Sequence, residues 1–153
     1  MKVYKIETIQ YINASIEECW DFFSSPKNLQ TITPDDMSFE IHDFDGKRMY
    51  PGQIITYTLK PLFGIKINWV TIITVSKEND YFIDEQRFGP YSFWHHKHFF
   101  EPTETGTKMI DIVHYALPFG FLGRIANHIM VKNKLKDIFE YRKNKIEELF
   151  NLK

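Results

Sequence analysis

The middle of the chain is a series of short segments in which apolar and polar residues alternate, separated by turn residues. Alternation predicts β-strands, because successive side chains of a strand point to opposite faces of a sheet. The short connections favour antiparallel neighbours in a meander, and Asp45-Gly46 is a hairpin signal between the second and third segments. The expected strands are residues 3–12, 38–44, 53–60, 65–76, 81–88, the stretch that follows Gly89-Pro90, and 108–117.

Helical patterns follow the first expected strand and end the chain. Ser15 and Glu18 have the spacing of a capping box, and Pro26 opens a second short helix. A longer pattern, free of Pro and Gly after its start, runs from Gly123 to Leu152. Its apolar stripe comprises Ile125, Ile129, Leu135, Ile138, Phe139, Ile146, Leu149 and Phe150. We therefore expect an α+β fold in which one long C-terminal helix packs across a curved antiparallel sheet.

Composition narrows the classes of function. The 153 residues fit one domain, residues 1–153. A formal net charge of −1 gives no electrostatic reason to expect binding of nucleic acid. The start of the chain lacks the apolar region of a secretory signal, and no apolar run is long enough to span a membrane. The lone Cys19 is consistent with a reducing compartment, so we expect a cytoplasmic protein whose oligomeric state the sequence leaves open.

One strand carries an unusual set of side chains. Alternation after Gly89-Pro90 places Trp94, His96, His98 and Phe100 on a single face. Two imidazoles between two large aromatic rings are typical of a small-molecule cavity, which is mostly apolar with a few fixed polar groups. The aromatic content of 16% fits either such a cavity or a bulky core.

The order of these elements and several short stretches resemble the SRPBCC superfamily (START-related, pollen-allergen-like) over essentially the whole chain. The resemblance lies in Trp20 and Phe23, Asn28-Leu29 with Ile32-Thr33-Pro34, Gly89-Pro90-Tyr91 with Trp94, His96, His98 and Phe100, Asp111, Val113 and Tyr115, Leu117-Pro118-Phe119-Gly120, and Phe139-Glu140-Tyr141-Arg142. The chain looks like a bacterial branch labelled ligand-binding or cyclase/dehydrase-like. The resemblance implies the helix-grip fold, with an internal cavity between the long helix and the sheet for hydrophobic or amphipathic molecules.

The first interpretation is a ligand-binding protein that needs no cofactor. Its expected apolar wall is Trp69, Trp94, Phe100, Val113, Ile125 and Ile129, and its expected polar contacts are His96, His98, Asp111 and Tyr115. The alternative is a cofactor-independent cyclase, dehydratase or hydrolase, with His96 or His98 as acid or base and Asp111 orienting it. The same imidazoles and carboxylate also fit a satisfied internal polar cluster. A third alternative is a protein-interaction domain of the same superfamily that uses its outer surface.

A metal site is not expected from the spacing of the histidines. His95 points to the opposite face from His96 and His98, so this strand offers two converging imidazoles. A catalytic zinc site needs three protein ligands, for which Asp111 is the candidate third, and no recognised metal-binding spacing is present. Arg142 near the apolar stripe of the last helix fits either an anchor for an anionic ligand group or an ion pair with Glu85 or Asp111.

Two turns carry large apolar residues where polar ones are usual. Leu62 and Phe63 lie in one, and Phe119 and Phe121 lie just before the long helix. In the helix-grip arrangement such turns border the mouth of the cavity. We expect them either to gate ligand entry, with transient membrane or partner contact, or to pack against each other as a closing lid.

Overall fold

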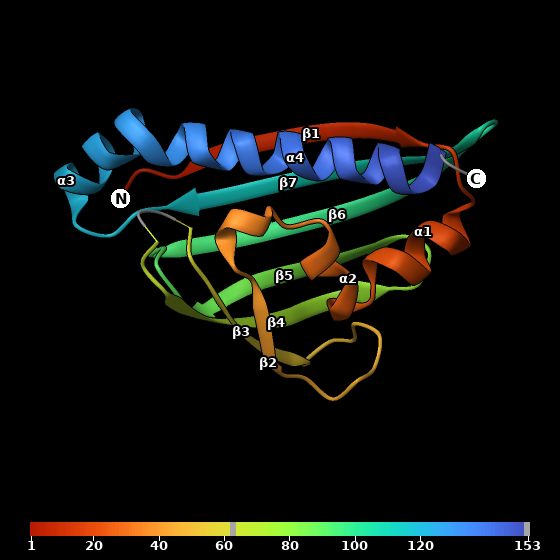
Figure 1. Ribbon diagram of the computed structural model, residues 1–153, viewed down its shortest axis with the longest axis horizontal. Coiled ribbons are helices and arrows are strands. Elements are labelled where there is room, and N and C mark those ends of the chain that lie inside the picture. Colours follow the sequence, from red (N-terminus) through yellow and green to blue (C-terminus); the bar gives the residue numbers. More distant parts are fainter. Residues whose placement is uncertain (62–63, 152–153) are drawn as a thin grey trace.

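The computed structural model describes residues 1–61 and 64–151, and these form one curved sheet covered by helices (Figure 1). The strands are β1 (Tyr4–Ile12), β2 (Glu40–Asp43), β3 (Ile54–Leu59), β4 (Ile67–Lys77), β5 (Tyr81–Phe88), β6 (Phe93–Thr103) and β7 (Gly106–Ala116). They pair antiparallel in the order β1-β7-β6-β5-β4-β3-β2. The expected meander from the second strand to the last is confirmed, and β1 closes it by pairing with β7.

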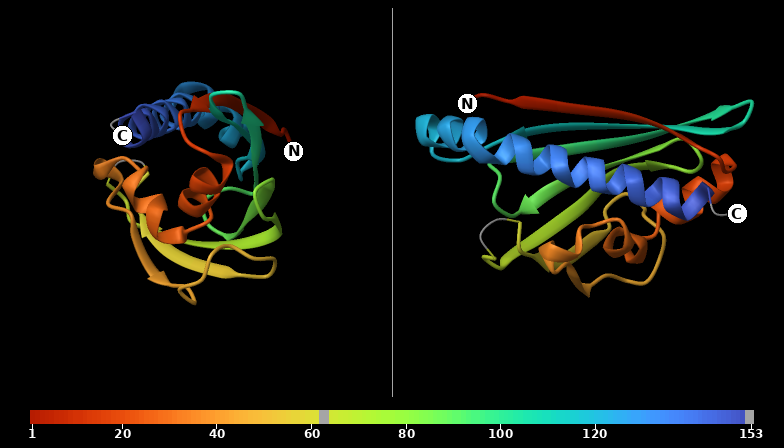
Figure 2. Two further views of the ribbon diagram at one scale, coloured as in Figure 1. Left: turned by 90° about the vertical axis from the view of Figure 1, so that its right-hand side faces the viewer. Right: turned by 45° about the horizontal axis from the view of Figure 1, so that its top comes forward.

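The helices lie on the concave side of this sheet. They are α1 (Ile16–Phe23), α2 (Pro26–Thr31), a 3-10 turn (Asp35–Met37), α3 (Gly120–Ala126), a π turn (Asn127–Val131) and α4 (Lys132–Asn151). Seen along α4, the sheet curls round the interior, while α4, α1 and α2 lie on its remaining side (Figure 2). The expected α+β architecture, with a long C-terminal helix across a curved antiparallel sheet, is confirmed.

Helix α1 anchors one end of the interior. Ser15 caps it as expected: its hydroxyl accepts from the Glu18 N–H, and the Glu18 carboxylate accepts from the Ser15 N–H. The expected apolar stripe is buried, and Trp20 packs edge-on against the rings of Phe82 and Phe100. Cys19 is part of this stripe, and burial raises the pKa of its thiol. A buried, protonated thiol is unreactive, which agrees with a packing role for this cysteine.

The hairpin expected at Asp45-Gly46 is wider than a tight turn. Strand β2 ends at Asp43 and β3 begins at Ile54, so residues 44–53 form a loop. The Asp45 carboxylate organises this loop by accepting hydrogen bonds from the Tyr50 hydroxyl and the Gln53 side-chain amide. An aspartate that binds several donors within its own loop stabilises that loop in place of a two-residue hairpin turn.

The prediction of which residues of the C-terminal helix face inward is wrong for the first part of the helix. Ile125 and Ile129 are 40% and 68% exposed. Ile129 and Leu135 are six residues apart, and six residues of an α-helix rotate by about 600°, which is about 120° short of two full turns. Ile129 and Leu135 therefore cannot lie on the same face of the helix. The inward positions in this part are Gly123, Asn127 and Val131. This start of the helix lies at the end of the molecule that also holds the N-terminus (Figure 1).

Candidate functional site

A cavity of about 150 Å³ lies between α4, α2 and the concave face of the sheet. We call it the central cavity. Its wall is mostly apolar, and one connected group of aromatic rings in it comprises Phe39, Tyr57, Trp69, Tyr91 and Trp94. Leu135, Ile138 and Phe139 cover it from α4. A cavity of this volume holds a guest the size of a benzene ring, and a larger guest requires wall side chains to move.

The residues expected at the site separate into three groups. Those that line the central cavity are Trp69, Trp94, His96 and His98. Those that are buried beside it but do not line it are Phe100, Asp111, Val113 and Tyr115. Those that are exposed, and for which the expectation is corrected, are Phe119, Phe121, Ile125 and Ile129. Leu62 and Phe63 of the expected gate lie outside the described residues.

Packing explains why the second group misses the cavity. Phe100 is on the inward face of its strand as expected, but α1 covers it. The Tyr115 hydroxyl donates to Asn127 Oδ1 at 2.8 Å, which ties β7 to the π turn. That hydroxyl is therefore engaged within the protein and is not directed at a ligand. Val113 is completely buried in the core cluster below α4.

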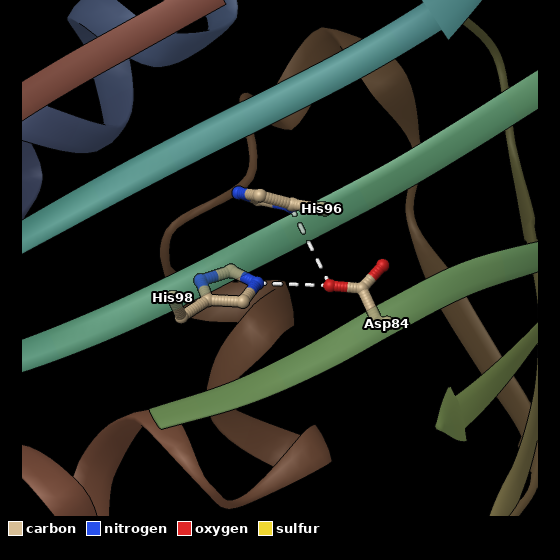
Figure 3. A group of neighbouring side chains, drawn as sticks. All are labelled: Asp84, His96 and His98. Atoms are coloured by element: carbon tan, nitrogen blue, oxygen red, sulfur yellow. Dashed lines mark hydrogen bonds and ion pairs between the residues drawn. The ribbon is translucent and has the colours of Figure 1, made fainter. Parts of the chain in front are cut away.

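Four side chains on β5, β6 and β7 form a polar cluster at the cavity wall, which we call the His–Asp cluster: the partly buried Asp84 and the buried His96, His98 and Asp111. Strand register creates it, because Asp84 pairs with His96 across β5–β6 and Asp111 pairs with His98 across β6–β7. Asp84 Oδ2 lies 2.8 Å from His98 Nε2 and 3.5 Å from His96 Nδ1 (Figure 3). Asp111 Oδ1 lies 3.1 Å from His96 Nε2 and 2.7 Å from His98 Nδ1.

Burial and the neighbouring charges set the protonation of this cluster. Burial alone raises the pKa of Asp84 and of Asp111, but the two imidazoles outweigh it, so both pKa values lie below the usual range. Burial, together with the charge of His98, lowers the pKa of His96. Burial also opposes the charged form of His98, but the neighbouring Asp111 and Asp84 carboxylates raise its pKa. His98 therefore holds a second ring proton more readily than His96, and both carboxyl groups favour the charged form.

The same contacts limit acid–base chemistry. Each ring nitrogen of His96 and His98 has a carboxylate oxygen within 3.5 Å. An imidazole that acts as a general base must reach the proton that it removes from a substrate. The acid–base alternative therefore requires one imidazole to leave a carboxylate first.

Arg142 brings a cation to the cavity from α4. It lines the central cavity, and its guanidinium lies 5.2 Å from the centre of the Phe139 ring. Neither ion pair expected for it is found among the described residues: Glu85 pairs with His95 on the outer face at 2.7 Å, and Asp111 pairs with the two imidazoles. Its Nε is buried and has no hydrogen-bond partner in the described part of the chain. A buried donor of this kind is costly unless a bound molecule or water accepts from it.

Sequence reasoning missed Asp84, Tyr57 and Tyr91, which all line the cavity. The sequence pattern could have predicted Asp84 as a site residue. Asp84 follows the inward Phe82 by two residues, so both point to the same face, and the Gly89-Pro90 turn makes its strand the neighbour of the histidine strand. Tyr91 lies in the turn itself, and burial raises its pKa. The alternation of apolar and polar residues along a strand does not predict whether a turn residue such as Tyr91 lines the cavity.

Comparison with solved structures relates this geometry to known folds. Protein CV1439 from Chromobacterium violaceum matches with a TM-score of 0.73 at 13% identity, covering 96% of this chain and 97% of that one. Ginseng (Panax ginseng) major latex-like protein 151 matches with a TM-score of 0.70 at 12% identity, covering 97% of each chain. Ara h 8.0201 matches with a TM-score of 0.64 at 16% identity, covering 96% and 99%.

The chain has the helix-grip fold. The expectation of an SRPBCC-like, pollen-allergen-like fold is thereby confirmed. The sequence itself matches no family model and no curated protein. In this helix-grip chain, none of the described helices is long and apolar enough to cross a membrane.

Proposed function

We propose that the protein binds a small amphipathic molecule in the central cavity, with an apolar body of about one ring and an oxygen-bearing head directed at Arg142. The observation that carries this proposal is a largely apolar cavity lined by Arg142, whose buried Nε has no hydrogen-bond partner among the described residues. Such a combination is typical of ligand sites, where apolar walls supply affinity and a few polar groups fix orientation.

The wall chemistry defines the body of the ligand. Trp69, Trp94 and Tyr91 meet edge to face or tilted around one side of the space. Two polar groups of this wall are engaged within the protein, since Trp69 Nε1 donates to Thr71 Oγ1 at 3.1 Å and the Tyr57 hydroxyl lies 3.0 Å from the same oxygen. An apolar ring or short alkyl group therefore fits this side, and a polar group there would lose its hydrogen bonds to water.

Arg142 defines the head of the ligand. A guanidinium donates to carboxylate, carbonyl or hydroxyl oxygens, and the hydrogen bond is strongest when the acceptor is charged. We therefore expect a carboxylate head to bind best and an amide head to bind next.

A titration with three compounds of similar size tests this proposal. Toluene, benzamide and benzoate share one ring, so the cavity should accept all three, and affinity should rise in that order. Nuclear magnetic resonance of the full chain measures each affinity and locates it through shifts of Trp69 and Trp94. Because the acceptor hydrogen-bonds a charged donor, benzoate should bind at least about tenfold more tightly than toluene.

A matched pair of variants checks the location. Ile138→Trp places a bulky ring in the cavity wall and should abolish binding of all three compounds, whereas Ile129→Trp on the exposed side of the helix should change nothing. Binding that survives in the Ile138 variant, with the fold intact by circular dichroism, would place the ligand elsewhere.

We also propose that one end of the protein contacts an anionic membrane surface when ligand is exchanged. Exposed apolar residues crowd this end: Phe119, Phe121, Leu122, Ile125 and Ile129. The sequence has no acidic residue between Asp111 and Asp137, whereas Arg124 and Lys132 lie in this stretch. Exposed apolar side chains flanked by basic ones are typical of surfaces that insert shallowly into anionic lipid. Phe119 holds a left-handed backbone (φ 65°), a conformation that costs energy and that function often maintains.

Vesicle sedimentation tests the membrane contact. The protein should bind vesicles that contain about 30% phosphatidylglycerol, an anionic lipid. It should not bind vesicles of phosphatidylcholine alone. Phe121→Ser with Leu122→Ser should weaken this binding at least about tenfold, because each apolar side chain contributes about 1.5–3 kcal/mol when buried. Tyr11→Ser, which removes a similarly exposed ring near the other end of the molecule, is the control and should bind like the wild type. Equal loss in both variants would contradict a specific membrane-facing end.

A further inference from the structure

We propose that Asp84, His96 and His98 form a binding site for a divalent transition-metal ion, open to the central cavity. The three side chains offer one carboxylate oxygen and two imidazole nitrogens, and these donor atoms all lie within 4.8 Å of one another. They converge from two neighbouring strands, β5 and β6 (Figure 3). The sequence did not predict a metal site here, because Asp111 was the candidate third ligand and Asp84 was not considered.

The spacing of the donor atoms suits a small first-row ion. A tetrahedral ion with bonds of about 2.1 Å separates its ligand atoms by roughly 3.4 Å. Asp84 Oδ2 lies 2.8 Å from His98 Nε2 and 3.5 Å from His96 Nδ1. These two contacts differ from that spacing by about 0.6 Å at most, and the remaining pair of donor atoms lies within 4.8 Å. Modest side-chain shifts on rigid strands therefore convert the cluster into a ligand set. Two imidazoles and a carboxylate are donors that zinc, iron, cobalt and nickel accept.

Asp111 occupies the position of an outer partner to both imidazoles. When His96 Nδ1 and His98 Nε2 face the ion, the opposite nitrogens face Asp111 Oδ1, at 3.1 Å for His96 and 2.7 Å for His98. The His98 contact lies within ion-pair distance but does not have hydrogen-bond alignment. Metal-bound histidines characteristically donate their second N–H to a carboxylate, which fixes the ring and strengthens the ligand. A hydrogen-bond cluster with a purely structural role does not require one carboxylate behind two converging imidazoles. This arrangement therefore favours a metal site.

The charges and the position agree with this assignment. Two carboxylates, Asp84 and Asp111, balance a dication when both imidazoles are neutral. Asp84, His96 and His98 line the cavity while Asp111 lies behind them, so the fourth coordination position faces the cavity. Adding Arg142 gives the metal-loaded site a net charge of +1, which favours an anionic head on the ligand of the proposed function. The metal site itself rests on the cluster alone and stands if that ligand is wrong.

Titration of the full-length protein with Co²⁺ alone tests the site. We expect saturable binding of one ion per chain with the visible absorption of a low-coordinate nitrogen–oxygen site, and complete displacement by Zn²⁺. The cobalt complex should also show two hyperfine-shifted imidazole N–H signals, one for each histidine that faces Asp111. This spectrum uses the wild-type protein, so it decides the question even where a variant fails to fold.

Variants separate ligands from outer residues. Asp84→Asn should weaken Co²⁺ binding at least about 100-fold, whereas Asp111→Asn should weaken it about 10–100-fold and keep the same absorption bands. His128→Gln, which removes an exposed imidazole on the π turn, is the control and should leave affinity unchanged. The absence of stoichiometric binding to wild type, or a loss that follows His128 and not Asp84, would overturn the proposal. Failure of the benzoate titration with intact Co²⁺ binding would reject the ligand and leave the metal site standing.

Discussion

Replacing Asp111 with alanine should lower the free energy of unfolding by roughly 3–5 kcal/mol, the largest stability effect expected from a single polar residue here. Asp111 is buried and contacts His96 at 3.1 Å and His98 at 2.7 Å. Its removal leaves the buried His98 with one carboxylate neighbour, Asp84. It also breaks a buried side-chain link between β6 and β7. Urea unfolding followed by tryptophan fluorescence and circular dichroism measures the change.

An exposed ion pair gives the matched control for this prediction. Asp36 accepts from Lys134 at 3.0 Å, and its side chain is 69% exposed. Asp36→Ala removes a contact of similar length and should cost less than about 1 kcal/mol, because water solvates the remaining charge of Lys134. Equal and small losses in the Asp36 and Asp111 variants would show that the buried cluster contributes no special stability.

Replacing Arg142 with methionine should weaken benzoate binding by about 10–100-fold and change toluene binding less than about threefold. Methionine keeps an unbranched apolar side chain at this position of the cavity wall but removes the guanidinium with its buried, unpartnered Nε. Calorimetric titration of both compounds measures the two affinities. A selective loss for benzoate identifies Arg142 as the contact for the ligand head.

The control for Arg142 is an arginine outside the cavity. Arg87 is exposed at the end of β5, so Arg87→Met lowers the net charge equally without touching the wall. If both variants lose benzoate affinity alike, general electrostatic attraction accounts for binding. If the Arg142 variant loses toluene and benzoate equally, the residue shapes the cavity and does not hold the head.

Much of the fold follows from local patterns. Alternation located each strand, and β5 was predicted with its observed ends, Tyr81 and Phe88. Alternation also placed Trp94, His96, His98 and Phe100 on one face, as the structure has them. These features depend on the period of two in a strand and on short turns, both of which a sequence displays directly.

The errors arise where the result depends on packing between distant elements. Phe100 has the expected orientation, but whether it meets a cavity or Trp20 depends on where α1 lies. Ile125 and Ile129 continue the apolar pattern of the C-terminal helix, but they lie on a different face of the helix from Leu135. Packing against the sheet determines which of these faces is buried. Asp84 became visible as a site residue through the register of β5 with β6. A single sequence does not display such long-range relations.

The most direct test of a ligand-binding cavity is the location of benzoate in its complex with the full-length protein. Intermolecular nuclear Overhauser effects should connect the benzoate ring with the side chains of Trp69, Trp94 and Ile138, which line the central cavity. Contacts confined to the exposed side chains of α3, or binding that produces no contact with these three residues, would contradict the account.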